Sequence, residues 1–384
     1  MNPDPYASAG VNVPLGDAFS SYCGGVCHRS WRNSHFVEVT DLTSGHFRGP
    51  RGFQFVNLPK GSIMTAGADG VGTKHVVIDA AGRHHTTADN LLAMCGGDIT
   101  RYGGIPLVFM NILDLASLGK AIKDDATYAA AQSLMDGLAK SAREQHYVLL
   151  GGETAELPGC VTSENPEATL NCLWGGFMIG AYHPSKMILG NQMRPGDRVV
   201  ALRDVCRSNG ISLLRKWLAQ ELGPKWWQHS DNEFVQEIAA PAALYERFLV
   251  EMHGWTREGF SPLVQMNGIA NISGGGILGK FGDLIFQYGL SAHLDNLWGP
   301  PGVMSLCARS MDLDDKSCYG TWCCGNGTLV VVPENAVETF IGHASGYDIE
   351  ARDAGRIEEI VEGSLPSITI RSGFTGDEFT HHCK

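Results

Sequence analysis

The sequence predicts a mixed α/β (α+β) protein of two domains. Strand-like and helix-like segments alternate along the chain, a pattern typical of helices packed on sheets. The length of 384 residues exceeds the roughly 250–300 residues at which a single hydrophobic core stops growing. The alternation of strand-like and helix-like segments is interrupted around His183-Pro184-Ser185 and then begins again. We therefore expect an N-terminal domain over residues 1–183 and a C-terminal domain over residues 184–384.

The N-terminal half alternates helix and strand as this fold class requires. In chain order we expect a helix over 87–99, a strand over 105–113 (IPLVFMNIL), a helix over 124–146, a strand over 147–150 and a strand over 174–182 (WGGFMIGAY). The helix over 124–146 has the clearest apolar stripe, and Asp124 and Asp125 suit its N-terminus. The strand that follows this helix runs directly into Gly151-Gly152-Glu153.

The C-terminal half continues the alternation. In chain order we expect a strand over 198–202, a helix capped by Ser208, a strand over 325–333 (GNGTLVVVP) and a short helix from Asn335. The helix after Ser208 carries an apolar stripe from Ile211 to Leu222. The pair Trp226-Trp227 stands in a polar segment and allows two interpretations, a surface contact with a partner or a local packing plug.

Charge and composition exclude several classes of protein. Asp and Glu (41) outnumber Lys and Arg (29), and the net charge of −12 argues against a binder of nucleic-acid backbones. No apolar run approaches the roughly 18 residues that span a bilayer, so we expect no membrane partner. The eleven cysteines lack zinc-site spacing and follow no secretory signal, which favours a cytoplasmic protein.

Glycine is the main compositional excess, at 48 residues in 384 against about 7% in average usage. Six clusters set glycine beside charged or polar residues: 69–74, 96–98, 151–156, 208–210, 273–276 and 324–327. Each cluster alone is compatible with a plain turn. Together they favour a phosphate site, because exposed backbone N–H groups cradle phosphate oxygens and carboxylates bind Mg²⁺. The candidate carboxylates are Asp69, Asp98, Glu153 and Glu156.

The cluster at 69–74 (DGVGTK) matches neither common nucleotide-binding motif. A Walker A loop needs four residues between its first glycine and the Gly-Lys-Ser/Thr that follows. A dinucleotide fingerprint needs a third glycine, which is missing. The sequence therefore predicts a Mg²⁺–nucleotide site of another type.

Seven motifs in a fixed order carry a resemblance to a known family. They are 6–13 (YASAGVNV), 68–74 (ADGVGTK), 92–98 (LAMCGGD), 150–159 (LGGETAELPG), 208–216 (SNGISLLRK), 269–277 (IANISGGGI) and 321–327 (TWCCGNG). In this order and spacing they resemble aminoimidazole ribonucleotide synthetase, the phosphoribosylformylglycinamidine cyclo-ligase of purine synthesis. The resemblance runs nearly end to end.

The resemblance implies a two-domain α/β protein whose N-terminal domains pair into a homodimer around a shared β-barrel. It implies ATP bound with Mg²⁺ in a cleft between the domains, and a small ribonucleotide as substrate. In the family's reaction, ATP activates the formamide oxygen of formylglycinamidine ribonucleotide. A nitrogen of the substrate then closes the imidazole ring, and ADP and phosphate are released.

The resemblance also implies roles for individual residues. Asp69 and Asp98 are expected to bind Mg²⁺ and, with Lys74, to form the catalytic group. The expected nucleotide-binding residues are Gly70, Gly72, Thr73, Glu153 and Thr154. The residues expected to hold the ribonucleotide or face the transferred phosphoryl group are Arg207, Ser208, Asn209, Gly274, Gly275 and Gly276.

The substrate-side motifs depart from the family pattern. Arg207 and Asn271 stand where the family usually has His, Gly97 and Cys323 where it usually has Asn, Ser273 replaces Thr, and residues 48–53 rewrite a basic segment. The two His positions lose side chains that titrate near neutral pH. Arg207 cannot act as an acid or base there, but it can bind a phosphate bidentately.

Two alternatives to the cyclo-ligase stay open. One is a sibling ATP-dependent enzyme that phosphorylates or activates another small molecule, as selenophosphate synthetase and thiamine-monophosphate kinase do within the superfamily. The other is a catalytically inactive nucleotide-binding paralogue, which the exchanges at Arg207 and Asn271 would fit.

Overall fold

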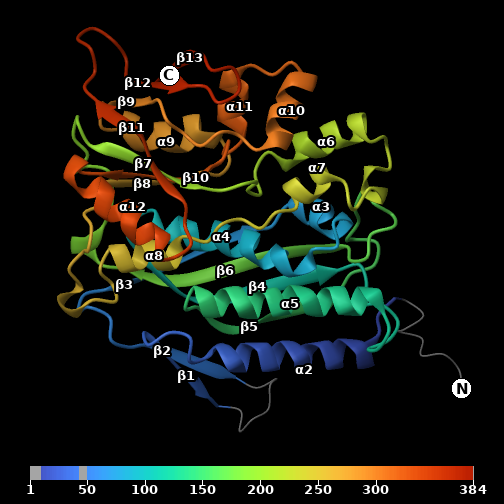
Figure 1. Cartoon of the computed structure of the whole chain (residues 1–384). Helices are drawn as coiled ribbons and strands as arrows, with labels where there is room; N and C mark the ends of the chain where they lie inside the picture. Colours follow the sequence, from blue (N-terminus) through green and yellow to red (C-terminus); the bar gives the residue numbers. More distant parts are fainter. Residues whose placement is uncertain (1–9, 43–49, 384) are drawn as a thin grey trace, which may run out of the picture.

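The computed structural model describes residues 10–42 and 50–383, arranged as two α/β units that follow one another along the chain (Figure 1). The first unit holds a two-stranded and a four-stranded sheet, and the second holds a seven-stranded sheet. The predicted α/β class is confirmed. Residues 6–9 of the motif at 6–13, and residues 48 and 49 of the rewritten segment, lie outside the described residues.

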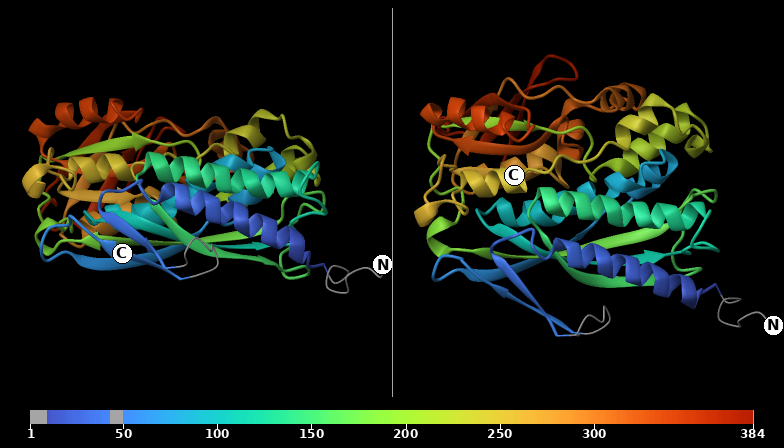
Figure 2. Two further views of the ribbon diagram at one scale, coloured as in Figure 1. Left: turned by 90° about the horizontal axis from the view of Figure 1, so that it is seen from below. Right: turned by 60° about the horizontal axis from the view of Figure 1, so that its bottom comes forward.

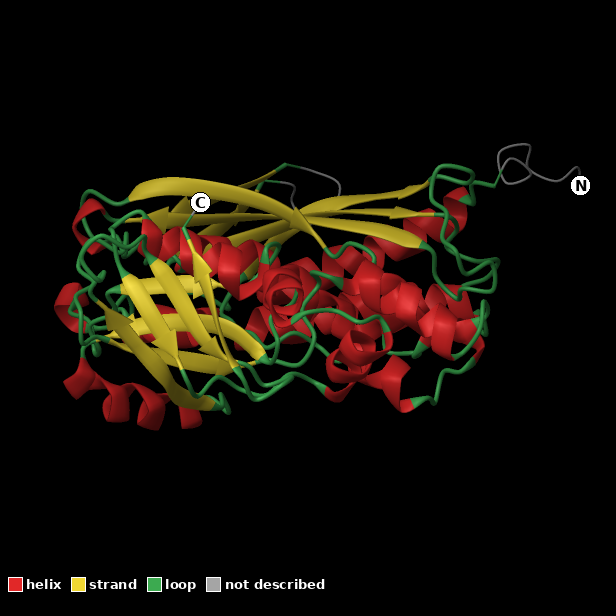
Figure 3. Ribbon diagram, turned by 90° about the horizontal axis from the view of Figure 1, so that it is seen from above, coloured by secondary structure: helices red, strands yellow, loops and turns green. Residues whose placement is uncertain are grey.

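The first unit is a four-stranded sheet with helices on one face (Figure 3). Its elements are α2 (Val13–Ser30), β1 (Val37–Asp41), β2 (Arg51–Phe55), β3 (Ile63–Gly70), α3 (Lys74–Ala80), α4 (Thr87–Thr100), β4 (Ile105–Leu115), α5 (Ala126–Glu144), β5 (Val148–Glu156) and β6 (Cys172–Tyr182). The strand order is β3-β6-β4-β5, in which only β4 and β5 run parallel. Helix α2 lies alongside β5, next to the hairpin β1–β2 (Figure 2).

The second unit is a seven-stranded sheet in the order β13-β12-β9-β11-β7-β10-β8. Its elements are β7 (Arg198–Arg203), α6 (Ile211–Glu221), α7 (Glu233–Ile238), α8 (Glu246–Met252), β8 (Gly268–Asn271), α9 (Gly276–Phe286), β9 (Ser291–Leu294), α10 (Gly302–Ser310), α11 (Asp315–Thr321), β10 (Asn326–Val332), α12 (Val337–Ser345), β11 (Ala351–Glu358), β12 (Ser367–Arg371) and β13 (Glu378–His382). Its neighbours pair antiparallel except β9 and β12. The expected boundary near residue 184 falls between β6 and β7.

The two units share packed surfaces. Val77 and Ile78 of α3 are buried in the hydrophobic core of the second unit. In return, Val250 and Trp255 are buried among residues of the first unit, where the Trp255 indole N–H donates to the carbonyl oxygen of Gly103 at 2.9 Å. Helix α4 runs through this junction, and 12 of its 14 residues are buried, so a side chain on either face meets protein.

Most predicted elements are present with shifted ends. The helix predicted over 124–146 is α5, and Asp125 caps it by accepting from the N–H groups of Thr127 and Tyr128 at 2.9 and 3.1 Å. The strand predicted over 147–150 was too short, because β5 continues to Glu156 in parallel pairing with β4. Trp226 is 1% exposed within the core, so packing is the correct interpretation of the first tryptophan of the pair.

The cap predicted at Ser208 is wrong. Helix α6 begins at Ile211, and its N-cap is Gly210 with a φ of +76°. A Cβ on Gly210 would lie 2.3 Å from the Trp322 ring, so both the backbone angle and the contact require glycine there. Among the described residues, none of the helices is long and apolar enough to cross a membrane.

Candidate active site at the domain junction

The first motif lies where β3 leads into α3. Asp69 stands at the end of β3, and its carboxylate accepts from the Gly70 N–H at 2.6 Å. Gly72 turns the chain with a φ of +66°, and α3 begins two residues later. The Thr73 hydroxyl lies 3.4 Å from the Ser212 hydroxyl of α6, which brings this turn to the second unit. The turn therefore belongs to the domain junction.

Lys74 does not face open space. Its ammonium donates to Asn90 Oδ1 at 2.7 Å, to the carbonyl oxygen of Ala240 at 2.7 Å and to that of Cys206. An ammonium group has three donors, so these partners use all of them. Burial lowers the pKa of Lys74. In this arrangement Lys74 ties α3 to the second unit, and no donor of its ammonium is left for the predicted phosphate contact.

Asp98 lies at the junction near Asp69. It sits on α4 with a half-exposed side chain, and the Arg101 guanidinium lies 4.0 Å from its carboxylate. Burial raises the pKa of Asp98, and the charge of Asp69 raises it further, while nearby Arg101, Lys280 and Arg207 lower it. One acidic and three basic side chains thus act on Asp98. Cationic groups from both units face the carboxylates of α4 and β3.

Arg207 is a deeply buried charge of the site, at 2% exposure. It donates to Asn271 Oδ1 at 2.8 Å and to the carbonyl oxygen of Gly327, and its Nε lies 3.5 Å from the Asp204 carboxylate. Burial raises the pKa of Asp204, and the neighbouring Arg207 lowers it. The Nε and Nη2 atoms of Arg207 are both buried without a hydrogen-bond partner.

The two glycine-rich motifs of the second unit lie side by side. Gly275 has a φ of +92° and leads into α9, while Gly210 leads into α6. A Cβ on Gly274 would lie 3.4 Å from Asn209 Nδ2. The Ser208 hydroxyl and Asn209 Oδ1 are buried without a hydrogen-bond partner. The structure therefore brings together the predicted substrate group of residues 207–209 and 274–276.

Glu153 and Thr154 lie apart from Asp69. They are on β5, at the opposite edge of the sheet from β3, with β4 and β6 between them. With residues of α2 they line a separate pocket of about 490 Å³. Glu156 accepts from the N–H groups of Asn12 and Leu118 at 3.0 and 2.7 Å. Within a single chain, Glu153 and Glu156 therefore do not join Asp69 at one metal ion.

Two residues of the site gave no signal in the sequence. Lys280 lies one turn into α9, and a lone lysine in an amphipathic helix is usually a solvated side chain. Glu246 begins α8, is 2% exposed, and has one carboxylate oxygen without a partner. Burial raises the pKa of Glu246 to about 7, and Arg207 and Asp204 also act on it. Only the docking of α8 against α4 shows that this glutamate lies beside the site.

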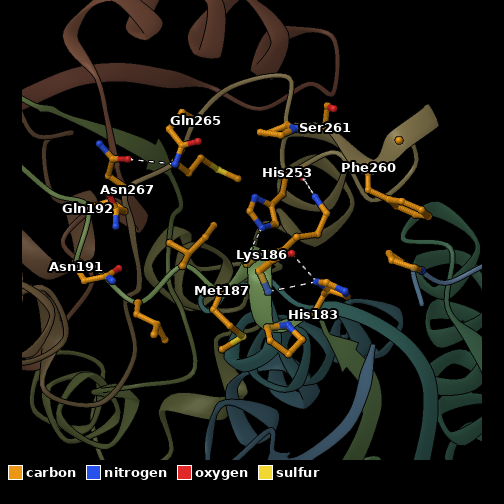
Figure 4. A pocket seen from close by; sticks show the side chains of 18 residues that line it. His183, Lys186, Met187, Asn191, Gln192, His253, Phe260, Ser261, Gln265 and Asn267 are labelled. Carbon is orange, nitrogen blue, oxygen red and sulfur yellow. Dashed lines mark hydrogen bonds between the residues drawn. The ribbon is translucent and has the colours of Figure 1, made fainter. Parts of the chain in front are cut away.

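A further groove of about 680 Å³ lies at the linker between the units (Figure 4). It is lined by parts of residues 183–192 and 253–267, and none of the predicted site residues faces it. The Nε2 of the His253 ring is hydrogen-bonded to the carbonyl oxygen of Lys186 at 2.6 Å, and burial lowers the pKa of His253 to about 4. We place the candidate active site at the motif cluster and not in this groove.

The fold defines the class of two-domain α/β proteins to which several solved structures belong. The chain is similar to the thiamine-monophosphate kinase of Stenotrophomonas maltophilia K279a, with a TM-score of 0.60 at 13% identity over 90% of this chain and 94% of that one. It is also similar to the hydrogenase maturation protein HypE in complex with ATP, with a TM-score of 0.56 at 13% identity over 86% and 87% of the chains. At this identity the likeness shows the fold alone.

The chain belongs to the AIR synthase related protein family, as its motifs predict. The family's N-terminal domain matches residues 54–181, and its C-terminal domain matches residues 194–365. The chain is 29% identical over 364 residues to the phosphoribosylformylglycinamidine cyclo-ligase of Myxococcus xanthus (strain DK1622), covering 92% of this chain and 95% of the relative. It is 27% identical over 370 residues to that of Geotalea uraniireducens (strain Rf4), covering 94% and 96%.

Proposed function

We propose that this protein is an ATP-dependent cyclo-ligase of purine synthesis. It would convert formylglycinamidine ribonucleotide into aminoimidazole ribonucleotide and release ADP and phosphate. The observation that carries the proposal is the similarity to cyclo-ligases over 92–94% of the chain, which leaves no domain of either protein unmatched. The gathering of motif residues from both units at one junction supports it.

Asp69 and Asp98 are suited to hold the Mg²⁺ of Mg-ATP. Mg²⁺ is usually bound by one or two carboxylates together with phosphate oxygens and water, so two carboxylates suffice. Their charges act on each other, and burial and mutual repulsion raise the pKa of Asp98, a cost that a divalent cation removes. When bound, Mg²⁺ would neutralise polyphosphate charge. The part of the chain that the structure describes holds no cluster of three or more His, Cys, Asp or Glu suited to a metal.

The residues of the second unit would hold the ribonucleotide. The hydroxyl of Ser208 and the amide of Asn209 have unused hydrogen-bonding atoms, and Arg207 carries a permanent positive charge. Buried polar atoms without partners are costly, so their concentration at one place favours a polar ligand there. These side chains would bind and orient the substrate, while neither Arg207 nor Asn271 exchanges a proton near pH 7.

Mg-ATP and formylglycinamidine ribonucleotide together test this function. The protein is incubated with both, and phosphate release and aminoimidazole formation are followed in parallel. We expect phosphate and aminoimidazole ribonucleotide to form in equal amounts. ADP without aminoimidazole would favour a sibling kinase or activating enzyme. Absence of turnover, with ATP still raising the Tm, would favour an inactive nucleotide-binding paralogue.

We also propose that the protein is a homodimer, formed through the outer face of the four-stranded sheet. Figure 3 shows helices on the inner face of this sheet only. The outer face carries exposed apolar side chains: Met64 is 72% exposed, Leu173 60%, Phe177 42% and Ile112 39%. Two such faces packed together would bury a continuous apolar layer. A cytoplasmic location fits the ten cysteines from Cys23 to Cys324, which are free thiols in the described part of the chain.

A further inference from the structure

Three residues that depart from the family motifs contact one another at the junction. Arg207 of the loop after β7 donates to Asn271 of β8, and Asn271 packs against Gly97 of α4. A Cβ on Gly97 would lie 2.3 Å from Asn271 Nδ2 and 2.7 Å from its Cγ. Any side chain at position 97 would clash with Asn271 unless the Asn271 side chain moved. The three exchanges therefore form one structural unit that spans both domains.

This unit fixes the Arg207 guanidinium in one orientation. Nη1 donates to Asn271 Oδ1 and to the carbonyl oxygen of Gly327, while Nε lies 3.5 Å from the Asp204 carboxylate without a hydrogen bond. The Tyr245 ring lies 5.8 Å from the guanidinium carbon. Nη2 is buried and has no hydrogen-bond partner in the protein. A buried charged donor left unpaired is costly, and an anionic oxygen is the acceptor that offsets this cost best.

We propose that Arg207 binds a phosphate oxygen through Nη2, with Asn271 as its positioning residue and Gly97 as the residue that makes room for Asn271. The proposal rests on the proposed function, because it takes the junction as the place where phosphorylated ligands bind. The ligand chemistry is a phosphate group. It comes from two sources in the proposed reaction, the phosphoryl group of ATP and the 5′-phosphate of the ribonucleotide.

Arg207 and Asn271 differ chemically from the two histidines that the family usually has at these positions. Arg and Asn keep the same protonation state throughout the neutral range, so they contribute charge and hydrogen bonds and no proton transfer. Arg207 and Asn271 would therefore determine how tightly phosphate binds without making its affinity titrate through the enzyme near pH 7. The other charged groups beside Arg207 are Asp204, Asp98, Lys74 and Glu246, and of these Glu246 has a pKa of about 7. A pH dependence of affinity that disappears in Glu246→Gln belongs to that glutamate.

Direct binding of inorganic phosphate and ribose 5-phosphate tests the proposal without any need for turnover. Calorimetric titrations compare the wild type with Arg207→Lys, which keeps the charge but loses the planar fork, and with Asn271→Ala. Arg198→Lys is the matched control, since Arg198 is the first residue of β7, at the other end of the strand from the Arg207 loop, and pairs with Asp353 at 2.7 Å. We expect Arg207→Lys to weaken phosphate about tenfold or more, Asn271→Ala about threefold to tenfold, and Arg198→Lys less than twofold.

The double variant separates positioning from simple loss of a contact. If Asn271 acts through Arg207, Asn271→Ala added to Arg207→Lys weakens phosphate by less than about twofold further. If the losses of phosphate affinity in the two single variants multiply in the double variant, Asn271 does not act through Arg207, and its positioning role is overturned. Phosphate binding that is absent in the wild type, or equal in the wild type and Arg207→Lys, would overturn the proposal. Asn271→Ala keeps every other partner of Arg207 and remains informative if Arg207→Lys unfolds.

Titrations in the presence of bound nucleotide distinguish the two possible sources of the phosphate group, ATP and the ribonucleotide. The titrations are repeated with saturating Mg-ADP and with a non-hydrolysable Mg-ATP analogue. Inorganic phosphate that binds beside ADP but is excluded by the analogue assigns Arg207 to the transferred phosphoryl group. Ribose 5-phosphate that still binds beside the analogue assigns Arg207 to the ribonucleotide. A protein that binds phosphate through Arg207 but forms no aminoimidazole contradicts the cyclo-ligase and leaves this proposal standing.

Discussion

Replacing Gly97 by alanine tests the packing of α4 against the second unit. The three heavy atoms nearest to a Cβ at this position all belong to the Asn271 side chain, at 2.3, 2.7 and 3.1 Å. Asn271 is 4% exposed and held by Arg207, so it cannot turn away without breaking that bond. Helix propensity acts in the opposite direction, because alanine is favoured over glycine within a helix. The two effects predict opposite signs.

The magnitudes decide the outcome. Overpacking a buried site costs about 1–3 kcal/mol, and breaking a hydrogen bond to a buried charge costs about 1–3 kcal/mol more. Helix propensity returns about 1 kcal/mol. We therefore expect Gly97→Ala to lower the free energy of unfolding by about 1–5 kcal/mol. At about 2–4 °C per kcal/mol for domains of 150–250 residues, the Tm should fall by several degrees.

Urea unfolding followed by tryptophan fluorescence measures this change, with Gly342→Ala as the matched control. Gly342 lies within α12 with nothing within 4 Å of its Cβ position, so alanine there should stabilise by about 0.5–1 kcal/mol. Asn271→Ala removes all three clashing atoms. In that background, Gly97→Ala should no longer destabilise. A Gly97→Ala protein as stable as Gly342→Ala, or no rescue by Asn271→Ala, would refute the packing argument.

Three further predictions concern the metal, the dimer and pH. Asp98→Asn should weaken Mg-ATP binding by about tenfold or more with an unchanged Tm, and unchanged affinity in calorimetry would remove Asp98 from the site. Phe177→Glu should convert the dimer to a monomer in sedimentation analysis. Leu365→Glu, at an apolar residue that is exposed elsewhere (61% against 42% for Phe177), should not; a dimer that persists in Phe177→Glu would contradict the proposed interface. Burial raises the pKa of Glu246 from 4.5 to about 7, so folded protein keeps a proton that unfolded protein has released. Stability from this group is complete below pH 4.5 and lost as the pH rises through 7, and the Tm of the wild type should therefore fall relative to Glu246→Gln between pH 5 and 8.

Much of the site was predictable because its motifs are local. Glycines that need a positive φ, such as Gly72, Gly210 and Gly275, mark helix entries within a few residues of sequence. Their neighbours Asp69 and Asn209 are then placed by the same turns. The family resemblance added the order of these turns and so their meeting at one junction. Helix and strand type followed from periodicity, and the α/β class with them.

The rest depended on docking between distant segments. In the sequence, Lys74 follows a glycine turn typical of phosphate-binding sites. Its partners Cys206 and Ala240 nevertheless come from the other unit. Glu153 follows a glycine pair that reads as a turn, but pairing with β4 extends the strand through it and carries it to the far edge of the sheet. Glu246 belongs to no motif in the sequence, and only the packing of α8 on α4 places it beside the site. No periodicity or motif in one segment contains these contacts.

An isotope experiment tests the proposed cyclo-ligase most directly. Formylglycinamidine ribonucleotide is labelled with ¹⁸O in its formamide oxygen and incubated with Mg-ATP and the protein. If this oxygen attacks the γ-phosphorus and leaves when the substrate nitrogen bonds to the formyl carbon, the C–O bond breaks and the label departs with phosphate. The proposal predicts one ¹⁸O atom in each phosphate released, together with unlabelled aminoimidazole ribonucleotide. Phosphate free of ¹⁸O would contradict it.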